Sequence, residues 1–171
     1  MTPRPSTPRS DPIGRRLPAL GPRGEGWFAI QLVLGLAVFV SGWAGPALDG
    51  PARTLSAVAG LLLISGGIVL AWPAVFRQRG QFTAMPHPLS GARLITDGPY
   101  RRVRHPMYGG LVLAAIGWAA LSASPPTCFL AILTFVFFDL KSRREEAWLS
   151  DQFPDYDRYR EHTRRLIPSI Y

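Results

Sequence analysis

Cysteine and lysine are almost absent from this sequence. Among its 171 residues there is one cysteine, Cys128, and one lysine, Lys141. A single cysteine cannot form an intramolecular disulfide, and it excludes a metal site built from several cysteines. No internal repeat is evident either. We therefore expect neither a disulfide framework nor a bound metal ion.

Acidic residues are also few, so the charge of the chain is one-sided. Eleven Asp and Glu stand against 19 Lys and Arg, which gives a formal net charge of +8. Such an excess is found in nucleic-acid-binding proteins and in membrane proteins with basic cytoplasmic loops. The hydrophobic fraction of 47% makes a membrane protein the first hypothesis. The positions of the bases decide between the two classes.

Four apolar stretches contain most of the hydrophobic residues. Residues 27–46 carry no charge, and residues 55–76 provide about 22 uncharged positions. Each is long enough to cross a hydrocarbon core of about 30 Å at about 1.5 Å per residue. Residues 107–123 and 127–140 are shorter, and the Ser-Pro-Pro between them has room only for a tight turn. We expect these two to form a helical hairpin that either dips into the membrane or crosses it.

The predicted fold is all-α. We expect a polytopic membrane protein with about four transmembrane helices, the last two of them a helical hairpin, followed by a short cytoplasmic C-terminal helix. Residues 27–171 are predicted to form a single domain, whereas residues 1–26 are basic and rich in Pro and Ser and are predicted to be a disordered tail. The helices are predicted at residues 27–46, 55–76, 106–123, 127–150 and 154–164.

The 19 basic residues are spread unevenly over the loops. Five precede the first apolar stretch, one follows it, six lie in residues 77–104, none lies in the hairpin turn, and seven lie from Lys141 onward. By the positive-inside rule, both termini and the central loop face the cytoplasm. This alternation explains the basic character without nucleic acid, so we expect no nucleic-acid partner. The bias towards Arg, Ala, Gly and Pro indicates a bacterial gene of high GC content, and hence the bacterial inner membrane.

The first polar cluster, T-D-G-P-Y-R-R-V-R-H-P-M-Y-G-G at residues 96–110, lies where the third helix should begin. Pro106 suits the first turn of that helix, which places His105 near the N-cap and Tyr108 one turn further on. The free N–H groups and partial positive charge of this helix end suit an anionic group. On composition alone, the arginines here are more typical of headgroup anchors, and Gly110 is more typical of close helix packing.

The second polar cluster, residues 141–168, follows the fourth apolar stretch and contains the acidic pair Glu145 and Glu146. Taken alone, such a pair is most typical of solvated charges that pair with nearby basic residues. An antiparallel hairpin with a tight turn, however, brings its two outer ends together. We therefore expect the first cluster and both glutamates to face the same volume at the membrane edge.

Four short motifs follow one another in this part of the chain. They are G-P-Y-R-x-x-R-H-P-x-Y-x-G, R-x-E-E-x-x-L, F-P-x-Y-x-x-Y and R-x-I-P, at residues 98–110, 143–149, 153–159 and 165–168. Each motif alone is weakly specific. Together, in this order and spacing, they resemble the integral-membrane methyltransferases of the isoprenylcysteine carboxyl methyltransferase and phospholipid methyltransferase families. The resemblance covers roughly residues 55 to 170.

The resemblance implies a methyltransferase that uses S-adenosylmethionine. Carried over position by position, it implies a set of cofactor-binding residues: Tyr100, Arg104, His105, Tyr108, Gly110, Glu145 and Glu146. The chemistry of the cofactor agrees, because its carboxylate suits Arg or His, and its ribose diol and amino group suit a Glu. Its sulfonium suits the faces of aromatic rings.

Two residues are candidates for a catalytic role. His105 is the best-placed proton acceptor if the methyl acceptor is a phenol or a thiol, whereas a carboxylate or an amine requires little or no base. Because its surroundings are rich in Arg, we expect His105 to position the substrate instead. Arg165 is the candidate for binding an anionic acceptor, although a snorkelling or helix-capping arginine is an equally good interpretation. A pocket that opens sideways to lipid indicates a lipid-like or amphiphilic small molecule as acceptor, with membrane lipids as neighbours.

Two other functions stay open. Membrane reductases of the steroid type also carry an R-H-P-x-Y motif and a tyrosine-rich C-terminal segment, and they transfer hydride from NADPH; the preceding G-P-Y and the pair Glu145 and Glu146 favour methyl transfer instead. A non-catalytic membrane protein that binds anionic lipid would explain the arginines. It would not explain why polar residues gather at one end of one hairpin. The sequence contains no indication of the oligomeric state or of the particular acceptor.

Overall fold

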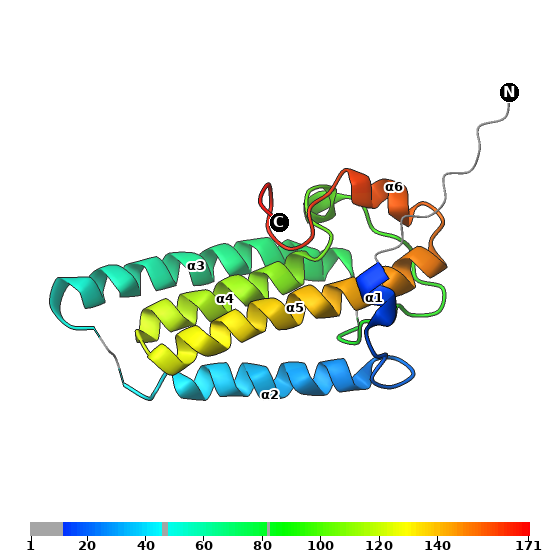
Figure 1. Cartoon of the computed structure of the whole chain (residues 1–171). Helices are drawn as coiled ribbons and strands as arrows, with labels where there is room; N and C mark the ends of the chain where they lie inside the picture. Colours follow the sequence, from blue (N-terminus) through cyan, green and yellow to red (C-terminus); the bar gives the residue numbers. More distant parts are fainter. Residues whose placement is uncertain (1–11, 46–47, 82) are drawn as a thin grey trace, which may run out of the picture.

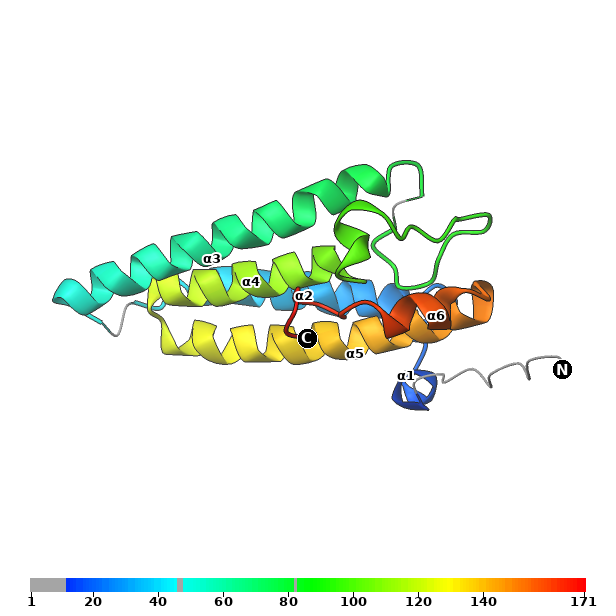
Figure 2. The same ribbon diagram turned by 90° about the horizontal axis from the view of Figure 1, so that it is seen from above.

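The computed structural model describes residues 12–45, 48–81 and 83–171. In these residues the chain is all-helical and contains no β-strand, as predicted. The elements are α1 (Pro12–Arg16), α2 (Glu25–Ser41), α3 (Gly50–Arg77), the 3₁₀ helix η1 (Gly98–Arg101), α4 (Pro106–Ser122), α5 (Pro125–Gln152) and α6 (Tyr156–Glu161). The axes of helices α2 to α5 lie roughly parallel to one another (Figure 1). Three parts of the chain gather at one end of the bundle: the loop before η1, the last turns of α5, and the whole of α6 (Figure 2). We call this the polar end.

The five predicted helices all exist, with shifted ends. The first stops at Ser41 and not at residue 46. Gly42 is its C-cap, and Gly45 then turns the chain with a φ of 92°, a value that favours glycine. The second begins at Gly50, five residues earlier than predicted, where Asp49 is the N-cap and a proline occupies the first turn. The last is shorter than predicted, since α6 runs only from Tyr156 to Glu161.

Two of these helices, α3 and α5, are long and apolar enough to cross a membrane, at 28 residues each. The apolar helices α2 and α4 have only 17 residues each. Large side chains on the outer faces of α2 and α3 point away from the protein: Val33, Leu62 and Val69 are 71%, 69% and 73% exposed. Apolar surface of this kind and extent is typical of contact with lipid or a partner. Spans at α2 and α4 stay predictions.

Helices α3 and α4 pack with their backbones in contact along a glycine seam, formed by Gly60 and Gly67 in α3 and by Gly110 and Gly117 in α4. A Cβ on Gly67 would lie 2.6 Å from the carbonyl oxygen of Gly110, and the reverse distance is also 2.6 Å. The corresponding distances between Gly60 and Gly117 are 2.5 and 2.7 Å. Small residues are therefore what lets the two helices approach so closely.

Helices α4 and α5 form the predicted hairpin. Helix α4 ends at Ser122, Ala123 turns the chain with a φ of 50°, and Pro125 begins α5. The hydroxyl of Ser124 donates to the backbone oxygen of Ser41 at 2.9 Å, which ties the turn to the end of α2. The hairpin thus brings the two predicted polar clusters to the same end of the bundle.

The N-terminal region differs from the predicted disordered tail. Residues 1–11 lie outside the described residues, but the part from Pro12 onward is folded against α5. Gly14 of α1 packs so closely that a Cβ there would lie 2.1 Å from the carbonyl oxygen of Arg143. The indole of Trp27 donates to the backbone oxygen of Pro18 at 3.1 Å. Composition indicated disorder because it carries no information about this close contact with α5.

The glycine seam predicts a position-specific loss of stability. In Gly67→Leu the new side chain collides with the backbone of α4, and we expect thermal unfolding in mild detergent to show a loss of about 1–3 kcal/mol. The matched control is Gly66→Leu at the adjacent position, where a Cβ meets nothing within 4 Å. The control should unfold near the wild-type temperature. Equal losses in both variants would contradict the seam.

Candidate active site

A cavity of about 310 Å³ lies at the polar end, between the α4–α5 hairpin, α6 and the loop that precedes η1. Hydrophobic residues such as Met85, Leu89, Leu149 and Phe153 form much of its wall. Its ionisable lining residues are Arg93, Tyr100, Arg104, His105, Tyr108, Glu145, Tyr156 and Tyr159. An apolar wall with a few convergent polar groups is typical of a small-molecule site.

Behind one wall of this cavity, the carboxylate of Glu146 joins three basic side chains. Its Oε1 lies 2.8 Å from Arg104 Nε and 3.2 Å from His105 Nε2. Arg165 Nε lies 3.4 Å from the same oxygen, and the Glu146 side chain has no exposed surface. We call these four residues the Glu146 cluster.

The charges in the Glu146 cluster determine its protonation. Glu146 lies in the polar C-terminal part of α5, beyond the uncharged residues 125–138. Burial by itself raises the pKa of this carboxyl group, but the hydrogen bond from His105 and the positive charges of His105, Arg104 and Arg165 outweigh burial and lower the pKa to about 2. The carboxylate is therefore ionised near neutral pH and can only accept hydrogen bonds. It follows that Nε2 of His105 carries a proton and donates it.

Arg104 also connects the C-terminal segment to the start of α4. Its Nη1 donates to the backbone oxygen of Thr163, and its own backbone N–H donates to the oxygen of Arg164 at 2.8 Å. Gly109 makes this crossing possible, because a Cβ there would lie 2.0 Å from the backbone oxygen of Leu166. Arg104 thus lines the cavity with a side chain whose Nε and Nη1 donors are already used within the protein.

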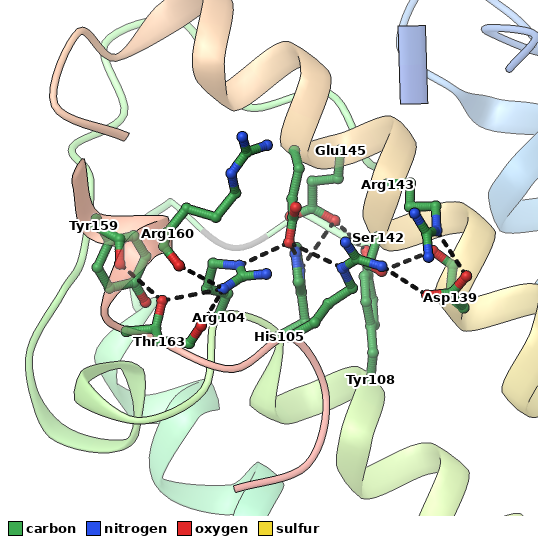
Figure 3. A network of polar contacts seen from close by, with 12 residues as sticks. Arg104, His105, Tyr108, Asp139, Ser142, Arg143, Glu145, Tyr159, Arg160 and Thr163 are labelled. Carbon is green, nitrogen blue, oxygen red and sulfur yellow. Dashed lines mark hydrogen bonds and ion pairs between the residues drawn. The ribbon is translucent and has the colours of Figure 1, made fainter. Parts of the chain in front are cut away.

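Glu145 differs from its neighbour, because successive residues on a helix point about 100° apart. Its carboxylate lines the cavity, and its Oε2 accepts a hydrogen bond from the hydroxyl of Tyr108 at 2.6 Å (Figure 3). The same oxygen lies 3.9 Å from His105 Nδ1. The rings of His105 and Tyr108 stack at 5.4 Å between centroids with 3° between their planes. Glu145 is therefore the acidic group of the pair that a ligand can reach.

Three tyrosines form a further wall of the cavity. The hydroxyl of Tyr159 donates to the backbone oxygen of Tyr100 at 2.6 Å. The hydroxyl groups of Tyr100 and Tyr156 are buried without a hydrogen-bond partner in the described part of the chain. Burial raises the pKa of all three phenols, so they stay protonated near neutral pH. A buried unpaired polar group costs about 1–3 kcal/mol, and a ligand with polar atoms would remove that cost.

The structure separates the predicted site residues into two sets. One set lines the cavity, and its members are Tyr100, Arg104, His105, Tyr108 and Glu145. The predicted meeting of the two hairpin ends is thereby confirmed. Their roles towards a cofactor stay predictions.

The other set, Gly110, Glu146 and Arg165, lies elsewhere. Gly110 is in the glycine seam, because only a residue without a side chain allows that backbone contact. Glu146 is buried behind the cavity wall. Arg165 was expected to bind an anionic acceptor, but its Nη1 contacts Asp139 Oδ1 at 2.8 Å and its Nε approaches Glu146. Its charge is therefore compensated within the protein.

Sequence reasoning missed the wall contributed by residues 83–97. This loop carries no helix and no charged motif, and its Pro and Gly content indicates only a turn-rich connection. The side chain of Gln81 links the two sides of this loop. Gln81 Nε2 donates to the backbone oxygen of Arg93 at 2.8 Å, and Gln81 Oε1 accepts from the Arg93 N–H at 3.0 Å. No local signal in the sequence links these two residues.

A ligand-sized cavity at the polar end of an apolar helical bundle, with one reachable carboxylate and one buried in an ion cluster, defines a membrane protein with a small-molecule site. The sequence profile described as phospholipid methyltransferase matches residues 55–156, which is more than half of the chain. The chain therefore belongs to the phospholipid methyltransferase family.

Several relatives share shorter segments with this chain. The protein-S-isoprenylcysteine O-methyltransferase of Schizosaccharomyces pombe is 37% identical over 79 residues, which is 45% of this chain and 34% of that protein. The cobalt-zinc-cadmium resistance protein CzcN of Cupriavidus metallidurans is 31% identical over 78 residues, or 45% and 36%. A probable protein-S-isoprenylcysteine O-methyltransferase of Oryza sativa subsp. indica is 30% identical over 115 residues, or 65% and 60%. The chain thus spans less than two thirds of each relative's length.

The two glutamates should differ in their effect on stability. Glu146→Ala leaves Arg104 and Arg165 buried with less compensation, and we expect a loss of about 3–5 kcal/mol in the free energy of unfolding. Glu145→Ala removes one hydrogen bond at a partly exposed position, with an expected loss of about 1 kcal/mol. Chemical unfolding of both variants in detergent measures the difference. A larger loss in Glu145→Ala would contradict the assignment.

The Glu146 cluster also predicts sensitivity to acid. The folded pKa of about 2 lies below the ordinary glutamate pKa of 4.5, so the stabilisation is complete above pH 4.5 and is lost as the pH falls towards 2. We expect the unfolding temperature of the wild type to drop between about pH 5 and pH 3. Glu146→Gln, which has no proton to gain, should start lower and change less. Parallel curves for the two proteins would show that another group is responsible.

Proposed function

We propose that this chain transfers a methyl group from S-adenosylmethionine to a lipid-like acceptor at the polar end of the bundle. The observation that carries the proposal is the position of Glu145, whose carboxylate lines the cavity and is held by Tyr108 in a chain of the phospholipid methyltransferase family. The distribution of basic residues favours the cytoplasmic face of a bacterial inner membrane as the location of this end. Both termini then face the cytoplasm.

The residues of the cavity fit S-adenosylmethionine. Its ribose diol and amino groups require hydrogen-bond acceptors, which Glu145 offers, and its carboxylate requires a cation, which Arg93 offers. The buried hydroxyl groups of Tyr100 and Tyr156 would gain the partners that the protein does not provide. The apolar side chains of the loop before η1 provide surface for a flat base.

The contribution of the protein is then positioning and the exclusion of water. When bound, the cofactor would supply a methyl group attached to a positively charged sulfur. The acceptor atom would bond to the methyl carbon from the side opposite the sulfur, and the sulfur would leave as a neutral thioether. The aromatic face of Tyr100 suits that positive charge. His105 in its neutral form keeps its proton on Nε2 towards Glu146, which leaves Nδ1 to accept a proton from a phenol or a thiol. A carboxylate acceptor would need no base.

Membership of the phospholipid methyltransferase family speaks against the two alternative functions. A steroid-type reductase requires a site for NADPH, and a lipid-binding protein without catalysis has no use for a cavity with a carboxylate in its wall. The names of the relatives refer to isoprenylcysteine and to metal resistance. The shared segments cover less than two thirds of those proteins, so we assign neither the acceptors nor the roles named for them to this chain.

Binding measurements on the detergent-purified protein test the proposal. We expect isothermal titration to show S-adenosylhomocysteine binding and no NADPH binding. Glu145→Gln should weaken S-adenosylhomocysteine binding about tenfold or more, because it removes the reachable negative charge. Glu161→Gln, at an exposed position on α6, is the matched control and should bind like the wild type.

The other outcomes favour the alternative functions. Binding of NADPH alone would move the function to the reductase, and binding of neither ligand by a folded sample would favour the non-catalytic membrane protein. Equal weakening by Glu145→Gln and Glu161→Gln would show that the effect is one of net charge and not of the cavity.

A further inference from the structure

Helix α3, which lies along one edge of the bundle, presents two different faces in its last turns (Figure 2). Ala71, Val75 and Gln78 line the cavity of the polar end. Trp72 and Phe76 do not line it, and they are 61% and 40% exposed. Because successive residues on a helix point about 100° apart, these two aromatic residues share a stripe beside that of Ala71 and Val75. The aromatic stripe is therefore a surface outside the candidate active site.

An arginine follows the aromatic stripe directly. The rings of Trp72 and Phe76 pack edge to face, with 5.2 Å between their centroids. The guanidinium of Arg79, one residue beyond the C-cap Gln78, lies 4.0 Å from the centre of the Phe76 ring. The long apolar helix thus ends in an aromatic pair and then a cation. This order is typical of the place where a transmembrane helix meets the head groups of the lipid.

The charge of Arg79 has no acidic partner in the described part of the chain. Asp97 is the one acidic residue between Asp49 and Asp139 in the sequence. Its carboxylate pairs with Arg77 at 2.6 Å. Arg79 is exposed, and its guanidinium forms no ion pair and donates no hydrogen bond within residues 12–45, 48–81 and 83–171. Its N–H donors are therefore free to bind a group outside the protein.

The neighbouring element η1 adds further positive charge. The ion pair between Arg77 and Asp97 holds η1 against the end of α3, and a Cβ on Gly98 would lie 3.2 Å from Arg77 Nε. Arg101, the last residue of η1, and Arg102 are both exposed. Neither forms an ion pair with any residue that the structure describes. The surface around the end of α3 therefore carries an excess of positive charge.

We propose that the outer face of α3 binds an anionic phospholipid at this end. A hydrocarbon chain of the lipid lies along the exposed apolar face that contains Val69 and Trp72. Its phosphate accepts hydrogen bonds from Arg79, because a planar guanidinium can donate two parallel hydrogen bonds to a phosphate. Arg101 adds attraction for the negative charge. The site lies outside the cavity, so this lipid is not the methyl acceptor and the inference does not rest on the proposed function.

Two simpler roles for Arg79 make different predictions. As a cation near a helix C-terminus, it can compensate the partial negative charge of that end. Its loss would then lower the stability of the protein without changing which lipids bind. As a snorkelling side chain, it can reach the phosphate of any phospholipid, and anionic and zwitterionic lipids would then bind equally well. A local preference for an anionic lipid distinguishes the proposed site from both roles.

Two exposed tryptophans can report the lipid beside them. Trp72 lies next to the proposed site, whereas Trp43, which is 73% exposed, follows the end of α2 that is tied to the hairpin turn at the opposite end. The protein is reconstituted in brominated phosphatidylcholine, whose bromine quenches tryptophan on contact. Unbrominated phosphatidylglycerol or phosphatidylcholine with the same chain length is then mixed in. The difference between wild type and Trp72→Phe gives the signal of Trp72, and Trp43→Phe gives that of Trp43.

We expect phosphatidylglycerol to relieve the quenching of Trp72 at a mole fraction at least about fivefold lower than phosphatidylcholine does, because an arginine at the membrane surface attracts an anionic head group. At Trp43 the two lipids should act equally. Equal action at Trp72 would overturn the proposal. The same preference at both tryptophans would also overturn it, because the effect would then belong to the net charge of the protein and not to a site.

Two variants with the same change of charge test the residue. Arg79→Gln should abolish the preference for phosphatidylglycerol at Trp72, whereas the matched control Arg158→Gln, at an exposed position on α6, should keep it. Thermal unfolding in detergent accompanies both, and Arg79→Gln should unfold near the wild-type temperature. A preference that persists in Arg79→Gln would contradict the site, and a loss of stability alone would identify the helix-capping role. Loss of the preference in both variants would show an effect of net charge and would also overturn the proposal.

Discussion

The buried carboxylate of Glu146 joins three parts of the chain that are distant in sequence. It accepts from Arg104 at the start of α4 and lies beside Arg165 of the C-terminal segment, while it belongs itself to α5. Arg104 in turn hydrogen-bonds to the backbone of the segment that contributes Tyr156 and Tyr159 to the cavity wall. Breaking this ion cluster would leave charges buried without compensation and would release one wall of the site. The cavity therefore depends most on a side chain that does not line it.

Close backbone packing complements this ion cluster on the other side of α4. The glycine seam holds α3 against α4, and this contact places Ala71 and Val75 of α3 in the cavity wall. Helix geometry then gives the adjacent glutamates separate roles, with Glu145 in the cavity and Glu146 in the cluster. The site lies where an apolar bundle becomes polar, so one ligand can contact both kinds of surface.

Much of the architecture follows from local features of the sequence. Apolar length predicts the four long helices, and the Ser-Pro-Pro turn predicts the hairpin, because only a tight reversal fits between residues 123 and 127. The hairpin in turn places the two polar clusters together, as observed. The motifs around His105 and Glu145 also predict the family. These successes share one reason: helix formation and chain reversal depend on residues that are close in sequence.

The sequence by itself determined an all-helical chain with apolar helices and one shared polar end. Only the tertiary structure decided which charged groups face the cavity and which face one another. Neighbouring glutamates look equivalent until the position of Arg104 and Arg165 is known, and Arg165 looks available until Asp139 is seen beside it. The same holds for Lys141, whose burial depends on α2, more than 100 residues away. Burial and ion pairing depend on contacts between distant segments, and no local pattern encodes them.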